Sequence, residues 1–191
     1  MRPTSETLRH AALDQLQSRD GQLLIGGESV SAILERVGRT PFYAYDRQAI
    51  ATRVAQLRAA LPEGMRLHYA IKANPMPALV AHMAGLVDGF DVASAGELRI
   101  ALAAGMAPGC IGFAGPGKSV PELQAAVAAG ITIHAESERE IAILHDLGSR
   151  AQRPRLAIRI NPAFELKTAG MKMGGGASQF GIDAERVPAL L

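Results

Sequence analysis

The chain has 191 residues, of which 48% are hydrophobic and 20% charged, and its 20 basic and 18 acidic residues leave a formal net charge of +2. This balance is typical of a globular protein of about one domain, argues against wholesale disorder and gives no indication of nucleic-acid binding. A single cysteine excludes an intramolecular disulfide and a cysteine-rich zinc site, and we find neither a secretory signal nor an apolar run near the ~20 residues that span a bilayer. We therefore expect a cytoplasmic protein with no membrane and no nucleic-acid partner.

The first 61 residues predict short elements followed by one longer helix. Residues 1–20 are polar and weakly helical, and residues 21–45 consist of short apolar pieces broken by glycine and proline, which is typical of short strands. Asp46 is placed to cap a helix over Arg47–Leu61, which Pro62 ends.

From residue 66 onward, strands and helices are expected to alternate about every 22 residues, a pattern typical of βα units on a parallel sheet. The expected strands are Arg66–Lys72, Gly89–Ser94, Cys110–Ala114, Ile131–Glu136 and Arg155–Ile160. The expected helices lie near residues 76–86, 96–104, 121–129 and 138–147, and a further helix is expected to begin near Asp183.

The turns before these helices share a capping pattern. Serine is followed three residues later by glutamate in the pairs Ser94 and Glu97, Ser119 and Glu122, and Ser137 and Glu140. This spacing predicts a capping box, in which the two side chains satisfy free backbone amides at the helix start. Asn74 and Pro75 predict a related start, with Asn74 as the cap and Pro75 as the first helical residue.

Alternation along the expected strands separates a bulky face from a small or polar one. The bulky side chains are Leu67, Tyr69, Ile71, Phe90, Val92, Ile111, Phe113, Ile131, Ile133, Leu156, Ile158 and Ile160. The opposite face carries His68, Ala70, Lys72, Asp91, Ala93, Gly112, Ala114, Thr132, His134, Glu136, Ala157 and Arg159. A doubly wound sheet is apolar on both faces, so this asymmetry favours an α/β protein of the (β/α)8 TIM-barrel type with a ligand inside. Lys72, Glu136 and Arg159 come late in their strands, where barrel enzymes place their chemistry.

The length does not fit a complete barrel. A (β/α)8 barrel needs about 250 residues, and only about five βα units are present by Leu191. We therefore expect a truncated sequence, with an N-terminal segment of short strands over residues 1–45 and a partial barrel domain over residues 46–191.

Lys72 is the sharpest candidate for chemistry. It ends an apolar strand on the inward side with Ala70 beneath it. Burial favours the neutral form of an amine, and a neutral amine is what Schiff-base formation requires. The alternative is a strand-end lysine that reaches to water.

Five sequence blocks stand in a fixed order between about residue 40 and residue 191. They are Tyr69–Pro75 (Y-A-I-K-A-N-P), Gly89–Leu98, Gly115–Ser119 (G-P-G-K-S), Arg159–Pro162 (R-I-N-P) and Phe180–Ile182. These blocks resemble the signatures of the fold-type III pyridoxal-phosphate-dependent decarboxylases, the ornithine/diaminopimelate/arginine decarboxylase family, which is related in fold to alanine racemase. The sequence around these blocks is most similar to that of the subgroup found with bacterial exosortase systems.

The resemblance implies an alanine racemase-like barrel that binds pyridoxal 5'-phosphate. It also implies a homodimer in which a C-terminal β domain, packed with residues 20–45, completes the partner's site. Carried over position by position, Lys72 would form the Schiff base with the cofactor, and Asp91 and Arg159 would lie beside the cofactor. Glu97 matches a family acid as well, but its place in a capping box favours a structural role.

The implied function is pyridoxal-phosphate-dependent decarboxylation of an amino acid of the diaminopimelate, ornithine or lysine kind by the intact parent, with residues 1–191 alone inactive or poorly folded. One alternative is a single-domain pyridoxal-phosphate-binding protein, either racemase-like or serving cofactor homeostasis. The natural reading frame past Leu191 distinguishes these two. The other alternative is a structural or interaction fragment that has lost its chemistry, which a folded sample unable to bind the cofactor would favour.

The remaining candidates have structural interpretations. Gly174–Gly176 is interpreted as a loop near the site entrance, because no helix N-terminus follows it to bind a phosphate. Gln179 stands where the family often has lysine, which leaves any subunit-bridging role of that position open. His68 and His134 are expected to be packed or hydrogen-bonded, and Cys110 is expected to be a buried spectator.

Overall fold

The structure is a computed structural model that describes residues 16–148, 153–162 and 178–190. The chain divides into two compact units, Met1–Leu61 and Pro62–Leu191, which are described separately below. None of the helices in the described residues is long and apolar enough to cross a membrane.

The N-terminal unit begins with a small antiparallel sheet. Its strands β1 (Gln17–Arg19), β2 (Gln22–Ile25) and β3 (Glu28–Ser29) pair in chain order. The weakly helical character expected of residues 1–20 is therefore wrong for residues 17–19, and residues 1–15 lie outside the described structure.

A helix that our sequence-based prediction lacks follows this sheet. Residues 21–45 were expected to form only short strands, but α1 spans Val30–Val37. The Ser29 side chain accepts a hydrogen bond from the Ala32 amide at 3.2 Å, and Gly38 ends the helix in the left-handed conformation. Both ends of α1 are therefore capped by residue types that favour helix termini.

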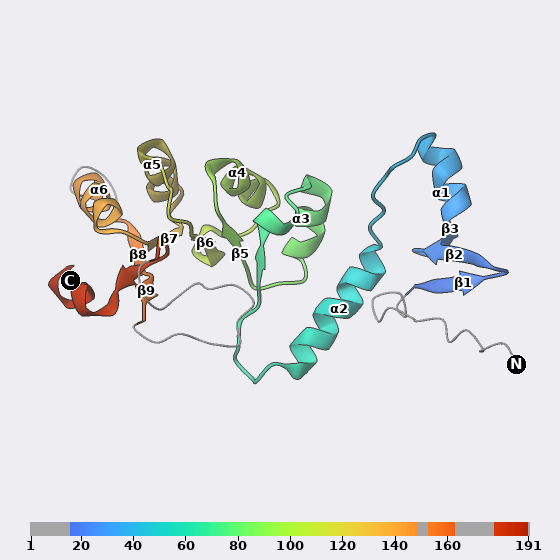
Figure 1. The fold of residues 1–191 in the computed structure, drawn as a ribbon, viewed down its shortest axis with the longest axis horizontal. Coiled ribbons are helices and arrows are strands. Elements are labelled where there is room, and N and C mark those ends of the chain that lie inside the picture. The colour runs from blue at the N-terminus through green and yellow to red at the C-terminus, as the bar shows by residue number, and fades with distance from the viewer. Residues whose placement is uncertain (1–15, 149–152, 163–177, 191) are drawn as a thin grey trace, which may run out of the picture. The chain divides into compact units, whose positions relative to one another are not determined.

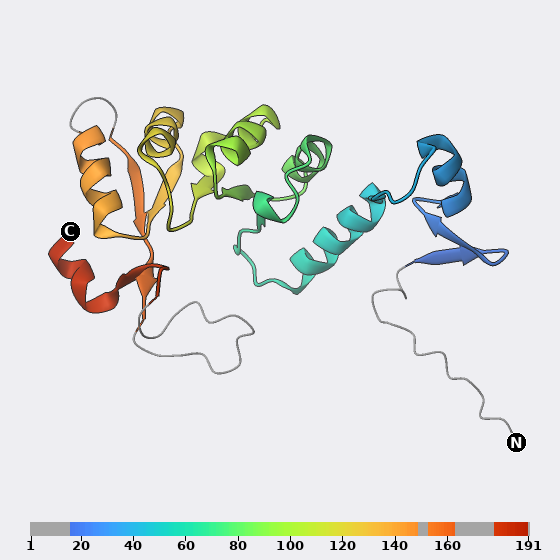
Figure 2. The ribbon, with the colours of Figure 1, turned by 45° about the horizontal axis from the view of Figure 1, so that its top comes forward.

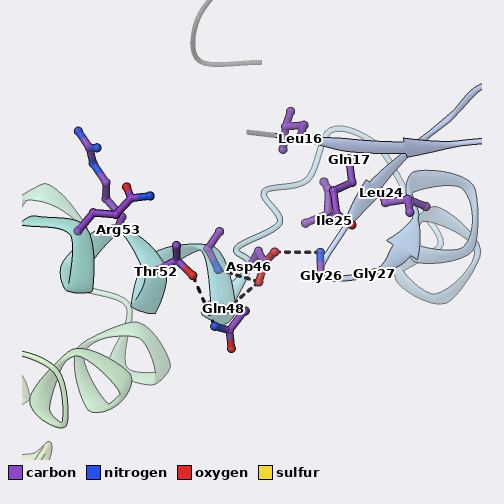
Figure 3. A pocket seen from close by; sticks show the side chains of 12 residues that line it. Leu16, Gln17, Leu24, Ile25, Gly26, Gly27, Asp46, Gln48, Thr52 and Arg53 are labelled. Atoms are coloured by element: carbon purple, nitrogen blue, oxygen red, sulfur yellow. Dashed lines mark hydrogen bonds between the residues drawn. The ribbon is translucent and has the colours of Figure 1, made fainter. Parts of the chain in front are cut away.

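The second helix of this unit, α2 (Arg47–Ala60), confirms the prediction of a helix capped by Asp46. Asp46 Oδ1 accepts the Gln48 and Ala49 amides at 2.8 and 3.2 Å, and its Oδ2 accepts the Gly26 amide at 3.2 Å (Figure 3). The cap thus also ties α2 to the turn between β2 and β3. Helix α2 belongs to the same compact unit as this sheet. The boundary expected after residue 45 stays a prediction.

The C-terminal unit contains a five-stranded parallel sheet with helices along one face (Figures 1 and 2). Its strands are β4 (His68–Ala70), β5 (Gly89–Val92), β6 (Ile111–Phe113), β7 (Thr132–Ala135) and β8 (Arg155–Ile158). The helices between them are α3 (Pro77–Ala84), α4 (Ala95–Ala103), α5 (Val120–Ala129) and α6 (Glu138–Gly148). The strands lie in chain order from β4 to β8, without the reversal that a doubly wound sheet requires. The expectation of a partial barrel is confirmed.

Short elements complete this unit. They are the 3-10 turns η1 (Ile71–Ala73), η2 (Pro108–Cys110) and η3 (Ala184–Leu190), and the strands β9 (Ile160–Asn161) and β10 (Ile182–Asp183), which pair in parallel. The helix expected to begin near Asp183 is thus a 3-10 segment.

The hydrophobic core lies between the sheet and its helices. Phe90, Ile111, Phe113 and Ile133 are buried, as the strand alternation predicts. The alternation fails at Leu156 and Ile160, which are 42% and 52% exposed. Leu156 belongs to β8, which among the described strands pairs with β7 alone.

The start of α3 differs from its prediction. Pro77 is the first helical residue, Met76 precedes the helix, and Asn74 instead accepts the Met76 amide at 3.0 Å. Strand β4 also ends earlier than expected, at Ala70, because Ile71–Ala73 turn as η1. Lys72 therefore lies just beyond the strand rather than within it.

Candidate active site

Lys72 lies in η1, at the carboxyl end of β4. Its side chain is exposed, whereas the preceding Ile71 is fully buried, so the burial expected for Lys72 is not present. Within the described residues the Lys72 amine has no hydrogen-bond or ion-pair partner. A primary amine free of a carboxylate is available to react with a carbonyl group.

Asp91 lies on the neighbouring strand, on the face opposite the helices. It pairs in register with Ala70, and its Oδ1 lies 3.2 Å from His68 Nδ1. An added Cβ at Gly112 would approach both Asp91 Oδ1 and His134 Nε2 to 3.0 Å. The glycine therefore leaves space on the sheet for the aspartate and the second histidine. The expectation that His68 is hydrogen-bonded agrees with this geometry.

Arg159 lies between β8 and β9. Strand β8 is at the opposite edge of the sheet from β4, which Lys72 follows. Its Nη1 is 3.0 Å from Glu136 Oε2, and its guanidinium carbon lies 4.8 Å from the centre of the Phe180 ring. The arginine side chain remains 29% exposed. No hydrogen bond or ion pair joins Arg159 to Lys72 or Asp91 within the described residues.

The three capping glutamates connect the ends of the strands to the helices that follow. Glu97 Oε2 accepts the Ala93 amide at 2.8 Å, and the Glu97 amide donates to Ser94 Oγ at 3.2 Å. Glu97 is thus engaged in helix capping, in line with its expected structural role. Glu140 similarly accepts the amide of Glu136 at 2.9 Å.

Glu122 joins two such turns. Its Oε2 accepts the Ser119 amide at 3.0 Å, and its Oε1 accepts the Ala95 amide at 3.1 Å. The hydrogen bonds from Ser119 are the main cause of a lowered pKa of Glu122, with smaller contributions from the Ala95 amide and the charge of Lys118. Partial burial acts in the opposite direction.

The sequence alone predicts neither the burial of Lys118 nor the pairing of Glu136. The Lys118 side chain is 1% exposed, lies 3.0 Å from Glu140 Oε2 and donates to the His134 carbonyl at 2.8 Å. Its place in the G-P-G-K-S turn was visible, but its burial depends on partners far along the chain. Strand alternation predicts that Glu136 lies on the inward face, but it does not predict the arginine partner.

A cavity of about 700 Å³ lies in the N-terminal unit and is lined by none of the three predicted site residues (Figure 3). Hairpin residues such as Gln17 and Ile25 line it together with α2 residues such as Thr52 and Arg53. No group of three or more potential metal ligands occurs among the described residues. Cys110 is a half-buried free thiol, Gln179 is exposed, and Gly174–Gly176 lie outside the described residues.

Residues 47–191 match the family model of the pyridoxal-binding domain of pyridoxal-dependent decarboxylases. The chain belongs to this family. Diaminopimelate decarboxylase of Aquifex aeolicus is 38% identical over 171 residues, which cover 88% of this chain and 40% of that protein. The L-glutamyl-(BtrI acyl-carrier protein) decarboxylase of Niallia circulans is 38% identical over 168 residues, covering 85% of this chain and 38% of that protein.

Solved structures of the family agree with the fold. Diaminopimelate decarboxylase from M. jannaschii in complex with L-lysine superposes with a TM-score of 0.78 at 27% identity, covering 93% of this chain and 43% of that one. The Helicobacter pylori enzyme complexed with L-lysine gives 0.70 at 32% identity, covering 84% and 42%. The chain thus spans about 40% of the length of these relatives.

The residues present fit the pyridoxal phosphate that this family uses. The cofactor carries an aldehyde and anionic oxygens. The exposed Lys72 amine suits the aldehyde, and the partly exposed Arg159 guanidinium suits an anionic oxygen. Gly112 leaves the sheet open beside Asp91, whose side chain is 47% exposed.

Proposed function

We propose that this chain is the cofactor-binding part of a pyridoxal-phosphate-dependent amino-acid decarboxylase, with Lys72 as the residue that bonds covalently to the cofactor. The observation that carries the proposal is the exposed amine of Lys72 at the carboxyl end of β4, without a partner among the described residues, in a chain of this family. Barrel enzymes place their reactive groups at this end of the strands.

The proposed roles of the other residues follow from their charge and position. Arg159 offers a fixed cation to an anionic oxygen of the cofactor, and Asp91 offers a carboxylate on the open face of the sheet. When bound, pyridoxal phosphate accepts the electron pair released as a substrate loses its carboxylate. The protein selects the bond that breaks by orienting the substrate.

The proposed substrate is an amino acid of the diaminopimelate, ornithine or lysine kind. Named relatives act on diaminopimelate and on an L-glutamyl carrier protein, and solved relatives bind L-lysine. We further propose a cytoplasmic homodimer that belongs to an exosortase-associated subgroup, and activity that requires sequence beyond Leu191. This requirement is motivated by the share of the relatives that the chain spans.

The test of Lys72 is borohydride trapping. The purified chain is mixed with pyridoxal phosphate, reduced and digested, and the modified peptide is identified by mass spectrometry. We expect the cofactor mass on the Lys72 peptide, loss of the adduct in Lys72→Ala, and an unchanged adduct in the matched control Lys167→Ala. An adduct that persists in Lys72→Ala, or modification spread over all lysines, contradicts the assignment.

The test of the activity is carbon dioxide release from the candidate amino acids. We expect none from residues 1–191 and release by the protein from the natural reading frame extended past Leu191. If that frame instead ends soon after Leu191 and the product binds the cofactor without turnover, the single-domain cofactor-binding protein replaces the decarboxylase. Sustained release by residues 1–191 would overturn the requirement for further sequence.

A further inference from the structure

Arg159 is held on two sides by groups from different loops. Glu136 Oε2, at the end of β7, lies 3.0 Å from Arg159 Nη1, and the Phe180 ring lies 4.8 Å from the guanidinium carbon. A hydrogen-bonded carboxylate and an aromatic ring within cation–π distance restrict the orientation of a guanidinium more than either contact alone. This arrangement leaves Arg159 29% exposed.

Glu136 is itself immobilised. Its side chain is fully buried, and its second oxygen, Oε1, accepts the Gly115 amide at 2.6 Å. The Glu136 amide donates to Glu140 Oε2 at 2.9 Å. Because both carboxylate oxygens are engaged and the backbone is tied to α6, Glu136 presents a fixed acceptor to Arg159.

A second buried pair supports the same corner of the sheet. Lys118 Nζ lies 3.0 Å from Glu140 Oε2 and also donates to the carbonyls of Gly115 and His134. The four side chains Lys118, Glu136, Glu140 and Arg159 balance two positive and two negative charges. A buried carboxylate is tolerated when it is paired and hydrogen-bonded, as Glu136 is here.

The position of Phe180 is fixed by the residue after it. Gly181 has φ +82°, and a Cβ there would approach the Arg159 carbonyl oxygen to 2.9 Å and the Asn161 amide nitrogen to 3.0 Å. The Ile182 amide donates to the same Arg159 carbonyl at 2.8 Å. The close approach that only glycine permits therefore keeps the ring beside the arginine.

We propose that Glu136 is a positioning residue that holds the Arg159 guanidinium, together with the Phe180 ring, in the orientation in which it contacts pyridoxal phosphate. The contact with the cofactor rests on the proposed function, whereas the restraint on Arg159 is a property of the chain alone. Glu136 acts through Arg159 and touches no reacting atom.

The first measurement uses the chain without cofactor. The NMR signals of the Arg159 Nη1 protons, one of which is donated to Glu136 Oε2, report how slowly these protons exchange with water. In Glu136→Gln we expect at least tenfold faster exchange than in the wild type, because the charged hydrogen bond is lost. The matched control is Glu138→Gln, which makes the same change two residues away at an acid that pairs with Arg186 instead. Equal exchange rates in the wild type, Glu136→Gln and Glu138→Gln would overturn the proposal.

The second measurement is a double-mutant cycle on the affinity for pyridoxal phosphate. We expect Glu136→Gln to raise Kd about tenfold in the wild-type background and to have no effect in an Arg159→Gln background. An equal loss in both backgrounds would show that Glu136 acts on folding or on another group, and would overturn the proposal. If Glu136→Gln does not fold by circular dichroism, Phe180→Leu takes its place in both experiments, with the same expectations at lower amplitude.

The two proposals fail in different ways. If the wild-type chain acquires no cofactor on Lys72, the proposed function is contradicted and the affinity cycle is replaced by the exchange measurement. A restrained Arg159 that depends on Glu136 would then still support the positioning role of Glu136, and an unrestrained Arg159 would overturn it.

Discussion

Glycines on β5 and β6 determine which polar side chains can lie on the open face of the sheet. At Gly89 an added Cβ would lie 2.6 Å from the His68 ring, and at Gly112 it would lie 3.0 Å from both Asp91 and His134. Two imidazoles and a carboxylate therefore occupy space that other residue types would fill. The candidate site therefore depends on the absence of a Cβ at Gly89 and Gly112 as well as on the polar side chains beside them.

The Gly112→Ala variant tests this dependence. We expect the free energy of unfolding to fall by about 1 to 3 kcal/mol, because the methyl group overpacks against Asp91 and His134. We also expect weaker binding of pyridoxal phosphate, measured beside urea unfolding curves. Gly117→Ala is the matched control, since a Cβ there meets nothing within 4 Å. Equal behaviour of the two variants would show that the Gly112 position is not crowded.

Single residues also show which features of the candidate site the sequence does not predict. The family motif located Lys72, but strand alternation predicted a buried strand position, and the chain turns as η1 one residue earlier. The inward placement of Glu136 was predictable from alternation. Its pairing with Arg159 was not, because that contact depends on how β7 and β8 pair and on the turn between β8 and β9.

At the scale of elements, the serine–glutamate spacing predicted the starts of α4, α5 and α6 because capping is local. The glutamates nevertheless reach further than a simple capping box: Glu97 and Glu140 bond the amide that precedes the capping serine, and Glu122 also bonds Ala95. Helix α1 was missed although Ser29 and Gly38 bracket it. The glycines and proline of that segment favour breaks between short strands, and this stronger signal obscures the helix.

The cap at Glu122 predicts a pH-dependent stability. A lowered folded-state pKa contributes stability that is fully present above the ordinary value of 4.5 and is lost as pH falls through the folded-state value. We expect Glu122→Gln to lose about 1 to 2 kcal/mol of unfolding free energy at pH 7, and the difference from wild type to shrink below pH 4.5. Urea unfolding across this range, with the exposed Glu63→Gln as control, measures it. A difference that stays constant or grows at low pH would contradict the assignment.

At the scale of the whole molecule, the described sheet has two outer strands, β4 and β8. Leu156 on β8 is 42% exposed although it belongs to the bulky face, whereas Phe113 on the central β6 is fully buried. The barrel prediction holds for strand order, and its burial pattern fails where a neighbouring strand is absent from the described sheet. The failure is thus tertiary in origin, since the alternation of β8 itself resembles that of the inner strands.

Hydrogen exchange should follow this asymmetry. We expect amides of β6 to be protected at least tenfold more strongly than those of β8, because β6 pairs on both sides and β8 on one. Mass spectrometry of exchange in residues 1–191 measures the difference, and a protein extended past Leu191 is the comparison. Equal protection of β6 and β8 in residues 1–191 would show that the outer strand is covered.

The strand order of the sheet also bears on how the chain is made. Each strand from β5 to β8 pairs with the strand that was synthesised immediately before it. A nascent chain can therefore add one βα unit at a time to strands that have already left the ribosome. No strand from β5 to β8 requires a partner that is synthesised later. The contact order of such a sheet is low for a parallel arrangement, which favours rapid, vectorial folding during translation.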